Sequence, residues 1–416
     1  MYYVGIDIAK RSHVACVMRE DNTLAIHPFT FTSTKAGFKK FVIHLQSLGC
    51  SLDDIIIGME ATGLLFENLY RYLKDLKYLV VLLNPYQTSK FREMDTMKRV
   101  KNDNIDSIMI AALIKSGRFS QGYVSEEQLH SLRVLYRHRA SLEDQLKSIK
   151  RQVTTLLAVV FPELETIVSD CFSVTGLALL EKYPTAKHYD YASVDRILKT
   201  FRGIKGNNFS HKKAQMLLDL ARESIYSGSA KDERALSIRS NIALIRLLSQ
   251  QMQEIEAQMI KLFQEKQASS EEQASSEEQD EMAHLIDNLR TIPGVSDKTI
   301  LALLAECGNL DRFHNAKALT GYLGLYPTLE QSGANTKHGR LAKRGARLAK
   351  KAIYMAAIAS IRHNDELVQV YRNYRSKGRA PKECLVIVAR KLLAIIYAIY
   401  IHNTPYDPAR VFRAAR

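Results

Sequence analysis

Hydrophobic and polar positions change their spacing several times along the chain, and each change predicts a different kind of structure. The N-terminal part consists of short apolar runs typical of strands, separated by segments in which apolar residues follow the helical period. The predicted elements are, in order, strands at 2–9, 13–18 and 23–31, a helix at 35–48, a strand at 55–60, a helix at 64–76, a strand at 78–83 and a helix beginning near 103. An antiparallel meander followed by alternating helices and strands is the element order of a ribonuclease-H-like fold.

Heptads replace this pattern in the middle of the chain. Apolar residues recur at a and d positions over 126–160, interrupted by Arg139, and again over 238–262, with a polar Asn241. The two series predict long helices paired as an antiparallel coiled coil. Two ordinary core helices of a bundle are the alternative. Between them, 161–230 is expected to be a small helical cap, to which no chemistry is assigned.

A tandem Gln-Ala-Ser-Ser-Glu-Glu repeat at 267–278 lacks apolar periodicity and predicts a flexible acidic linker. After it, Ile292-Pro-Gly-Val295 between two helical patterns is typical of a helix–hairpin–helix unit, whose glycine turn can bind a phosphate, although a plain turn between helices has the same sequence. Helices at 348–363 and 384–401 are expected to form the core of a mostly helical C-terminal domain. The predicted fold class is therefore α/β plus α.

Composition adds a partner to this picture. The chain has 416 residues and a formal net charge of +15. Residues 331–416 contain 18 Lys+Arg and 4 Asp+Glu, an excess of +14, so nearly all the positive charge is in the last fifth of the chain. This favours a nucleic-acid surface there. The 5 cysteines are scattered without a CxxC spacing, which predicts a reducing cytoplasm and no zinc site. We expect neither a signal peptide nor a membrane span, and interpret the apolar run 392–401 as part of a buried helix.

Carboxylates occur at positions where a metal site could form. Asp103 and Asp106 have i, i+3 spacing and lie on one helical face, although two acids in a solvated first helical turn are also common. Asp7 lies within the first apolar strand, and Glu60 ends the strand 55–60. In a ribonuclease-H-like fold these four acids can meet, and carboxylate oxygens suit two magnesium ions that bridge a phosphate. An actin-like ATPase could share the Gly-Ile-Asp strand but would need glycine-rich phosphate loops, which we do not find.

A second group of chemically suitable residues lies near the C-terminus. Ser332 precedes a glycine and is followed by clustered cations, an arrangement suited to attack on a phosphodiester. A loop serine beside a phosphate-binding patch is the alternative. The candidate nucleic-acid-binding residues are Lys98, Arg99 and Lys101 before the aspartate pair, and Lys337, Arg340, Lys343, Arg344 and Arg347 after the serine.

Several motifs, in this order, resemble the insertion-sequence transposases that carry a DEDD acidic tetrad in a RuvC-like domain and a serine in a C-terminal transposase domain, the bridge-RNA-guided recombinases. The motifs are Gly5-Ile-Asp7-Ile-Ala-Lys10, Glu60-Ala-Thr-Gly63, Lys101-Asn-Asp103-Asn-Ile-Asp106, Ile292-Pro-Gly-Val295, Tyr322-Leu-Gly-Leu-Tyr-Pro327, Gln331-Ser-Gly333 and Lys343-Arg-Gly345. The resemblance covers essentially the whole chain. It implies a RuvC-like domain at 1–120, a coiled coil with its cap at 121–266, the linker at 267–281 and a serine transposase domain at 282–416.

The resemblance also implies a mechanism. Asp7, Glu60, Asp103 and Asp106 would hold magnesium, and Ser332 would be the nucleophile that forms a covalent serine–DNA intermediate. Protomers would pair into a dimer or tetramer with a composite active site. A noncoding bridge RNA would select the donor and target DNA by base pairing.

Two other functions fit the residues. The chain could be a junction-resolving nuclease of the ribonuclease-H-like class, in which water is the nucleophile, or a non-catalytic nucleic-acid scaffold. Tyr322 or Tyr326 could also replace Ser332 as the nucleophile.

Overall fold

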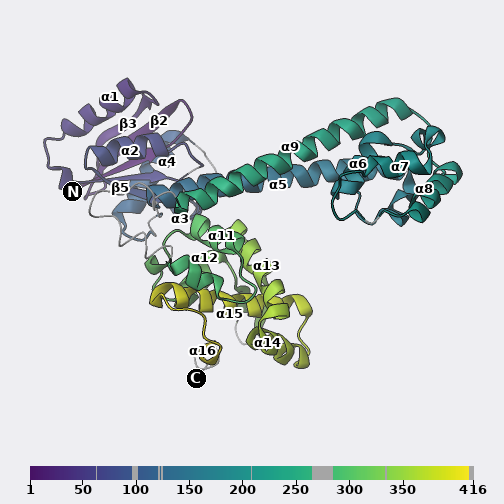
Figure 1. Ribbon diagram of the computed structural model, residues 1–416. Helices are drawn as coiled ribbons and strands as arrows, with labels where there is room; N and C mark the ends of the chain where they lie inside the picture. Colours follow the sequence, from purple (N-terminus) through teal and green to yellow (C-terminus); the bar gives the residue numbers. More distant parts are fainter. Residues whose placement is uncertain are drawn as a thin grey trace, which may run out of the picture. The chain divides into compact units, whose positions relative to one another are not determined.

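Figure 1 shows the computed structural model, which describes residues 1–61, 63–95, 102–119, 122, 125–207, 209–264, 284–332 and 335–411. The chain forms two compact units, Met1–Val124 and Ser125–Arg416. The predicted linker 267–281 lies outside the described residues. All five cysteines are described and free.

A mixed sheet forms the centre of the first unit. Its strands are β1 (Tyr2–Asp7), β2 (Ser12–Arg19), β3 (Leu24–Thr32), β4 (Ile55–Glu60) and β5 (Leu79–Leu83). They lie in the order β3-β2-β1-β4-β5, with β1, β2 and β3 antiparallel and with β4 and β5 parallel to β1. Every predicted strand is confirmed, and the sheet is consistent with a ribonuclease-H-like domain.

Helices cover both faces of this sheet (Figure 1). They are α1 (Lys35–Gln46) and α2 (Glu67–Asp75) on one face, α4 (Asp103–Lys115) on the other, and α3 (Pro85–Asp95) after β5. On the first face Phe41 of α1 and Leu69 of α2 share a core with Val4. On the second face Ile110 of α4 packs with Val81 of β5. Alternate residues of the strands therefore face two separate cores, as the period of a strand requires.

The second unit is built on two helices of 34 residues each, α5 (Glu127–Val160) and α9 (Lys231–Gln264). They run antiparallel, because Gln128 Nε2 near the start of α5 donates to the carbonyl of Leu262 near the end of α9, at 2.8 Å. Arg139, which interrupts the apolar pattern, forms a 2.6 Å ion pair with Glu256 across the helix pair. Coiled-coil packing itself stays a prediction.

A helical cap connects α5 to α9, as the sequence predicts. Its elements are two 3-10 turns, η2 (Pro162–Thr166) and η3 (Ala186–Tyr191), and the helices α6 (Val174–Lys182), α7 (Val194–Thr200) and α8 (His211–Glu223). Phe161 and Tyr189 stack edge to face in its core, with ring centroids 5.4 Å apart. This core is continuous with the ends of α5 and α9 that carry Val153 and Ile242.

The rest of the second unit is mostly helical. Residues 284–290 are helical, and the elements that follow are α11 (Asp297–Cys307), the 3-10 turn η5 (Leu310–Arg312), α12 (Ala316–Leu323), α13 (Arg347–His363), α14 (Asp365–Ser376), α15 (Pro381–His402) and α16 (Pro408–Val411). By length and composition α15 could cross a membrane. However, Val388, Leu392 and Ile396 place one face of α15 in the core, which agrees with the predicted buried helix.

The turn Ile292–Val295 lies directly before α11. Gly294 has a φ of +93°, and a Cβ there would lie 2.5 Å from the Cα of Ser360 on α13. The hydroxyl of Ser360 donates to the carbonyl of Pro293 at 3.2 Å. Close packing against α13 therefore explains the glycine by itself, and a phosphate-binding hairpin stays a prediction.

One element is not anticipated by the sequence pattern. Residues Pro327–Ser332 and Asn335–Leu341 form an antiparallel hairpin, β6 and β7, where we expected a loop. The segments Pro-Thr-Leu-Glu-Gln-Ser and Asn-Thr-Lys-His-Gly-Arg-Leu lack the alternation of apolar and polar residues from which a half-buried strand is predicted.

Candidate active site

Asp7 and Glu60 end two neighbouring parallel strands. The registered pairs of β1 and β4 run to Ile6 and Met59, and the strands end one residue later at Asp7 and Glu60. Both acids therefore lie at the carboxyl edge of the sheet, on adjacent strands. Both are half-buried.

A pair of glycines brings a helix onto these strands. Gly5 and Gly58 are cross-strand partners, and each lies two residues before one of the acids. A Cβ on Gly5 would be 2.0 Å from the carbonyl oxygen of Ser107, and one on Gly58 would be 2.7 Å from Cγ2 of Ile114. The helix α4 thus packs where the strands have no side chains. Since residues two apart share a strand face, Asp7 and Glu60 point to the side of the sheet that α4 covers.

The direction of α4 places its own acids at the same edge. Lys115, in the last turn of α4, donates a hydrogen bond to Asn22. Asn22 lies in the turn that follows β2, and the last residue of β2, Arg19, pairs with Tyr2 at the start of β1. The C-terminus of α4 is therefore near the beginning of β1, and its N-terminus is near the end of β1.

Asp103 and Asp106 lie in the first turn of α4, which is capped by the side chain of Asn102. Asp103 is exposed, which agrees with the alternative of a solvated first helical turn. Asp106, with 6% exposure, is buried, and the solvated-turn interpretation does not account for it. Thus three acids from three elements, Asp7, Glu60 and Asp106, lie toward the same edge of the sheet.

Helix α3 contributes two residues that sequence reasoning missed. Thr88 Oγ1 donates to Oε2 of Glu60 at 2.9 Å, and Arg92 Nε lies 3.2 Å from Oδ1 of Asp106. Their i, i+4 spacing puts both side chains on one face of α3. A threonine and an arginine at this spacing directly after a buried strand could have been noticed in the sequence, but nothing there indicates which carboxylates they contact.

These contacts bear on metal binding. Among the described residues, no three His, Cys, Asp or Glu side chains are gathered as a metal site. Instead, the guanidinium of Arg92 is the cation beside the buried Asp106. Carboxylate oxygens at one edge of the sheet match the ligand preference of magnesium. The buried Asp106 needs a positive partner both with and without a bound metal, because an unpaired buried carboxylate is costly. The residues therefore fit a divalent cation, although the side chains are not arranged around one here.

Ser332 is the last residue of β6 and pairs in register with Asn335 at the tip of the hairpin. Lys337 and Arg340 lie on β7, and Lys343 and Arg344 follow it. The side chains of 329–340 are outside the described set. Lys98, Arg99 and Lys101 lie wholly outside the described residues, so their predicted role stays a prediction.

The base of the hairpin is held against α12. Gly324 and Gly345 both have a positive φ, and a Cβ on Gly324 would lie 2.0 Å from the carbonyl oxygen of Arg344. Lys350 Nζ donates to the carbonyls of Ala342 and Arg344, at 2.9 and 2.7 Å. Lys350 was not identified from the sequence. These contacts give the glycines of the two motifs a packing role.

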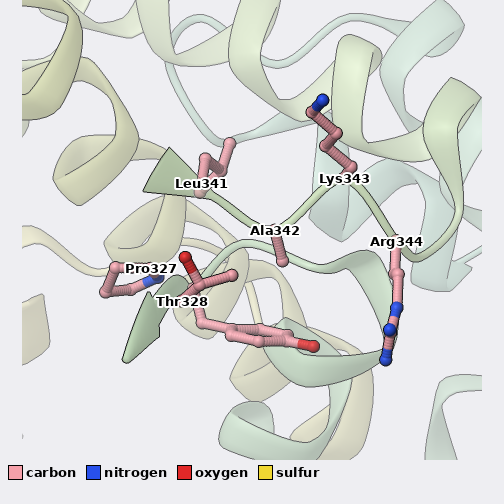
Figure 2. A pocket seen from close by; sticks show the side chains of 7 residues that line it. Pro327, Thr328, Leu341, Ala342, Lys343 and Arg344 are labelled. Atoms are coloured by element: carbon pink, nitrogen blue, oxygen red, sulfur yellow. The ribbon is translucent and has the colours of Figure 1, made fainter. Parts of the chain in front are cut away.

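A cavity of about 610 Å³ opens at this base, lined by residues 326–328 and 341–344. Figure 2 shows Lys343 and Arg344 extending from the segment in opposite directions. Arg347, which is further along, lies 3.7 Å from Asp144 of α5 with 84% of its side chain exposed. The cations of this region therefore remain accessible to a polyanion.

The two candidate tyrosines differ in their surroundings. Tyr322 donates its hydroxyl to the carbonyl of Glu306 at 3.2 Å, and burial raises its pKa above the usual value. The Tyr322 side chain is 40% exposed, like that of Tyr326, but its hydroxyl is already hydrogen-bonded within the protein and is therefore less suited to attack a phosphate. Tyr326 is 40% exposed and lines the cavity, so it remains an alternative to Ser332.

Comparisons with known proteins cover both units. A family model of DEDD transposases of the IS110 type, described as "Transposase", matches residues 4–162, and a model described as "Transposase IS116/IS110/IS902 family" matches residues 286–372. The chain is similar to the pilin gene-inverting proteins of Moraxella bovis and Moraxella lacunata, each 23% identical over 97% of this chain and 97% of the relative. It is also 32% identical to an IS110 protein of Streptomyces coelicolor, over 30% of this chain and 32% of that protein.

Proposed function

Because the chain belongs to the IS110/IS116/IS902 family of transposases, we propose that it recombines DNA by magnesium-dependent strand cleavage and exchange through a covalent serine–DNA intermediate. Membership of this family makes it a DNA-recombining enzyme with DNA as its substrate. The observation that best supports the proposed chemistry is the location of Asp7, Glu60 and Asp106 at the same edge of the sheet, on the side that α4 covers.

In this proposal Asp7, Glu60, Asp103 and Asp106 hold the magnesium ions. Bound magnesium would supply positive charge beside the scissile phosphate. Thr88 positions the carboxylate of Glu60 through its hydrogen bond. Arg92 balances the charge of Asp106 when the metal is absent, since a buried carboxylate without a cation is costly.

Ser332 carries out the transfer step. Its Oγ forms a bond to phosphorus while the bond from phosphorus to the 3′ oxygen breaks, and the serine proton is lost as the 3′ oxygen becomes a hydroxyl. Attack of another strand's 3′ hydroxyl on the phosphoserine reverses these bonds and joins the new ends. One phosphodiester-type bond is exchanged for another in each step, so no ATP is required.

The resemblance supports two further parts of the proposal. A bridge RNA selects donor and target DNA, and two or four protomers associate so that the acids of one meet the serine of another. Sequencing the RNA that co-purifies with the protein tests the first part. A structured RNA encoded beside the gene supports it, and purification of an active recombinase without RNA contradicts it.

The acidic site is tested with Asp7→Asn and Asp106→Asn, which remove charge but little volume. Both variants should lose strand exchange while they keep DNA binding, because neither substitution removes a cation. Asp53→Asn is the matched control, since Asp53 is an exposed acid of the same unit. Full strand exchange by either site variant would refute the acidic site, and loss of exchange by the control would show that the effect is not specific.

A further inference from the structure

The helical cap carries an exposed group of cations to which neither the active site nor the sequence motifs assign a role. We call it the cap patch, and it consists of Arg196, Lys199, Arg202, Lys205, Lys212 and Lys213. All six side chains are exposed. No acidic residue occurs between Asp195 and Asp219, so the segment contributes an uninterrupted positive charge.

The fold brings the two halves of this patch together. The rings of Phe201 and Phe209 contact each other with centroids 4.9 Å apart and close the turn between α7 and α8. Ile197 of α7 and Ala214 of α8 are buried in the cap core. The apolar positions therefore face inward at the turn, and the intervening cations are left on its surface.

The cations of the cap patch are not explained by internal ion pairs. Within the described part of the cap, Lys187 pairs with Asp190 at 2.5 Å and Arg222 with Asp219 at 3.6 Å. Arg246 of α9 pairs with Glu181 at 2.7 Å. Among the described residues, by contrast, no ion pair involves a side chain of the cap patch. The cap thus has paired cations for structure and a separate group that faces solvent.

Their location even works against stability. Lys212 and Lys213 occupy the first turn of α8, which contains no acid. Positive side chains are disfavoured near the N-terminus of a helix, where the helix dipole is itself positive. Of the cap patch, Arg196 also donates to the carbonyl of Tyr191 at 2.8 Å. Dense positive charge without acidic partners is expected where an external anion neutralises it.

We propose that the cap patch binds the phosphate backbone of duplex DNA without reading its sequence. A run of exposed lysines and arginines suits a regular polyanion, and DNA is the polyanion on which this family acts. The proposal rests on the recombination function only in taking DNA as the partner. It gives the cap the role of an additional DNA contact, distinct from the hairpin that carries Ser332.

The test compares two triple variants of the full-length protein. Lys199→Gln, Arg202→Gln and Lys212→Gln together remove half of the cap patch. Lys187→Gln, Arg222→Gln and Arg246→Gln together remove the same charge from ion-paired positions. Fluorescence anisotropy measures binding to a labelled random-sequence DNA duplex over a range of salt concentrations, with a chelator present so that no cleavage occurs.

The cap-patch variant should lower the slope of log K against log salt by about 2 to 3, because each phosphate contact contributes about 0.9. At low salt its affinity should fall about 10- to 100-fold, while the control variant stays within about 2-fold of the wild type. An unchanged slope, or an equal loss in the control, overturns the proposal. A loss seen with duplex RNA but not with DNA also overturns it. Because binding needs no chemistry, this test is independent of the proposed serine mechanism.

Discussion

Replacing Gly5 with alanine tests how the acidic site is assembled. The added Cβ would lie 2.0 Å from the carbonyl oxygen of Ser107 and 2.5 Å from the amide nitrogen of Ala111, whereas real Cβ atoms essentially never come within 3.0 Å of such atoms. The difference at Ser107 is 1.0 Å, so α4 and β1 must move apart by about that distance. The contacting atoms belong to the helix backbone, and no side-chain rotation can relieve them.

Two consequences should follow from Gly5→Ala. Overpacking of this kind costs about 1–3 kcal/mol of unfolding free energy. A displacement of about 1 Å at the acids of α4 should reduce strand exchange about 100-fold, because catalysis depends on geometry at that scale. Gly58→Ala should have a smaller effect, since its Cβ would lie 2.7 Å from the Ile114 side chain and not 2.0 Å from helix backbone.

Val4→Ala is the matched control for lost stability. Val4 is the neighbouring residue on β1, is fully buried, and faces α1 and α2 on the other side of the sheet. Its truncation should also cost about 1–3 kcal/mol, but α4 should stay in place. Denaturant unfolding and a strand-exchange assay are run on both proteins under conditions in which both are folded. If Gly5→Ala and Val4→Ala retain equal activity, the close packing of α4 does not set the geometry of the site.

Two further predictions concern charged contacts. In Arg92→Met, Asp106 loses its cation, so the metal-free protein should lose about 3–5 kcal/mol of stability, and added magnesium should raise its melting temperature more than that of wild type. Lys90→Met removes an exposed cation of the same helix and should show neither effect. An equal magnesium response in the two variants would contradict the role given to Arg92. Burial alone would raise the pKa of Glu143, but hydrogen bonds from Lys147 and Lys351 outweigh it and lower the pKa to about 2 from the ordinary 4.5. Because the pKa of Glu143 is lower in the folded protein than in the unfolded chain, the ionised carboxylate stabilises the fold above about pH 4.5, and this stabilisation is lost as the pH falls toward 2. Between about pH 4.5 and 2, the unfolding free energy of Glu143→Gln should fall by about 1–2 kcal/mol less than that of wild type, after allowance for solvent screening. Identical curves of unfolding free energy against pH for the two proteins would refute this role of Glu143.

The sequence was sufficient for the elements of the first unit because its strands are apolar and end at clear polar boundaries. Asp7 and Glu60 could be placed at strand ends for the same reason. The glycine pair could not be recognised, since the register of Gly5 with Gly58 becomes known only when β1 and β4 are paired. Thr88 and Arg92 were missed because their contacts are with residues distant in the chain.

The C-terminal domain was predicted less completely. Its helices follow from their apolar periods, but β6 and β7 are too polar for any period to reveal them. The motif glycines Gly324 and Gly345 contributed to the family resemblance, and the structure shows that they allow α12 to approach the base of the hairpin. A pattern of small residues does not distinguish close packing from catalysis.

The covalent intermediate tests the central claim most directly. The protein is incubated with its RNA, DNA and magnesium, denatured, and examined for a DNA adduct whose attachment site is mapped by mass spectrometry. We expect the phosphate on Ser332, an adduct in Tyr326→Phe and Tyr322→Phe, and none in Ser332→Ala. Cleaved DNA without any adduct would mean that water is the nucleophile, and an alkali-stable linkage mapped to Tyr326 would mean that the tyrosine is. Either result, judged by the mapped attachment site, would contradict the serine mechanism.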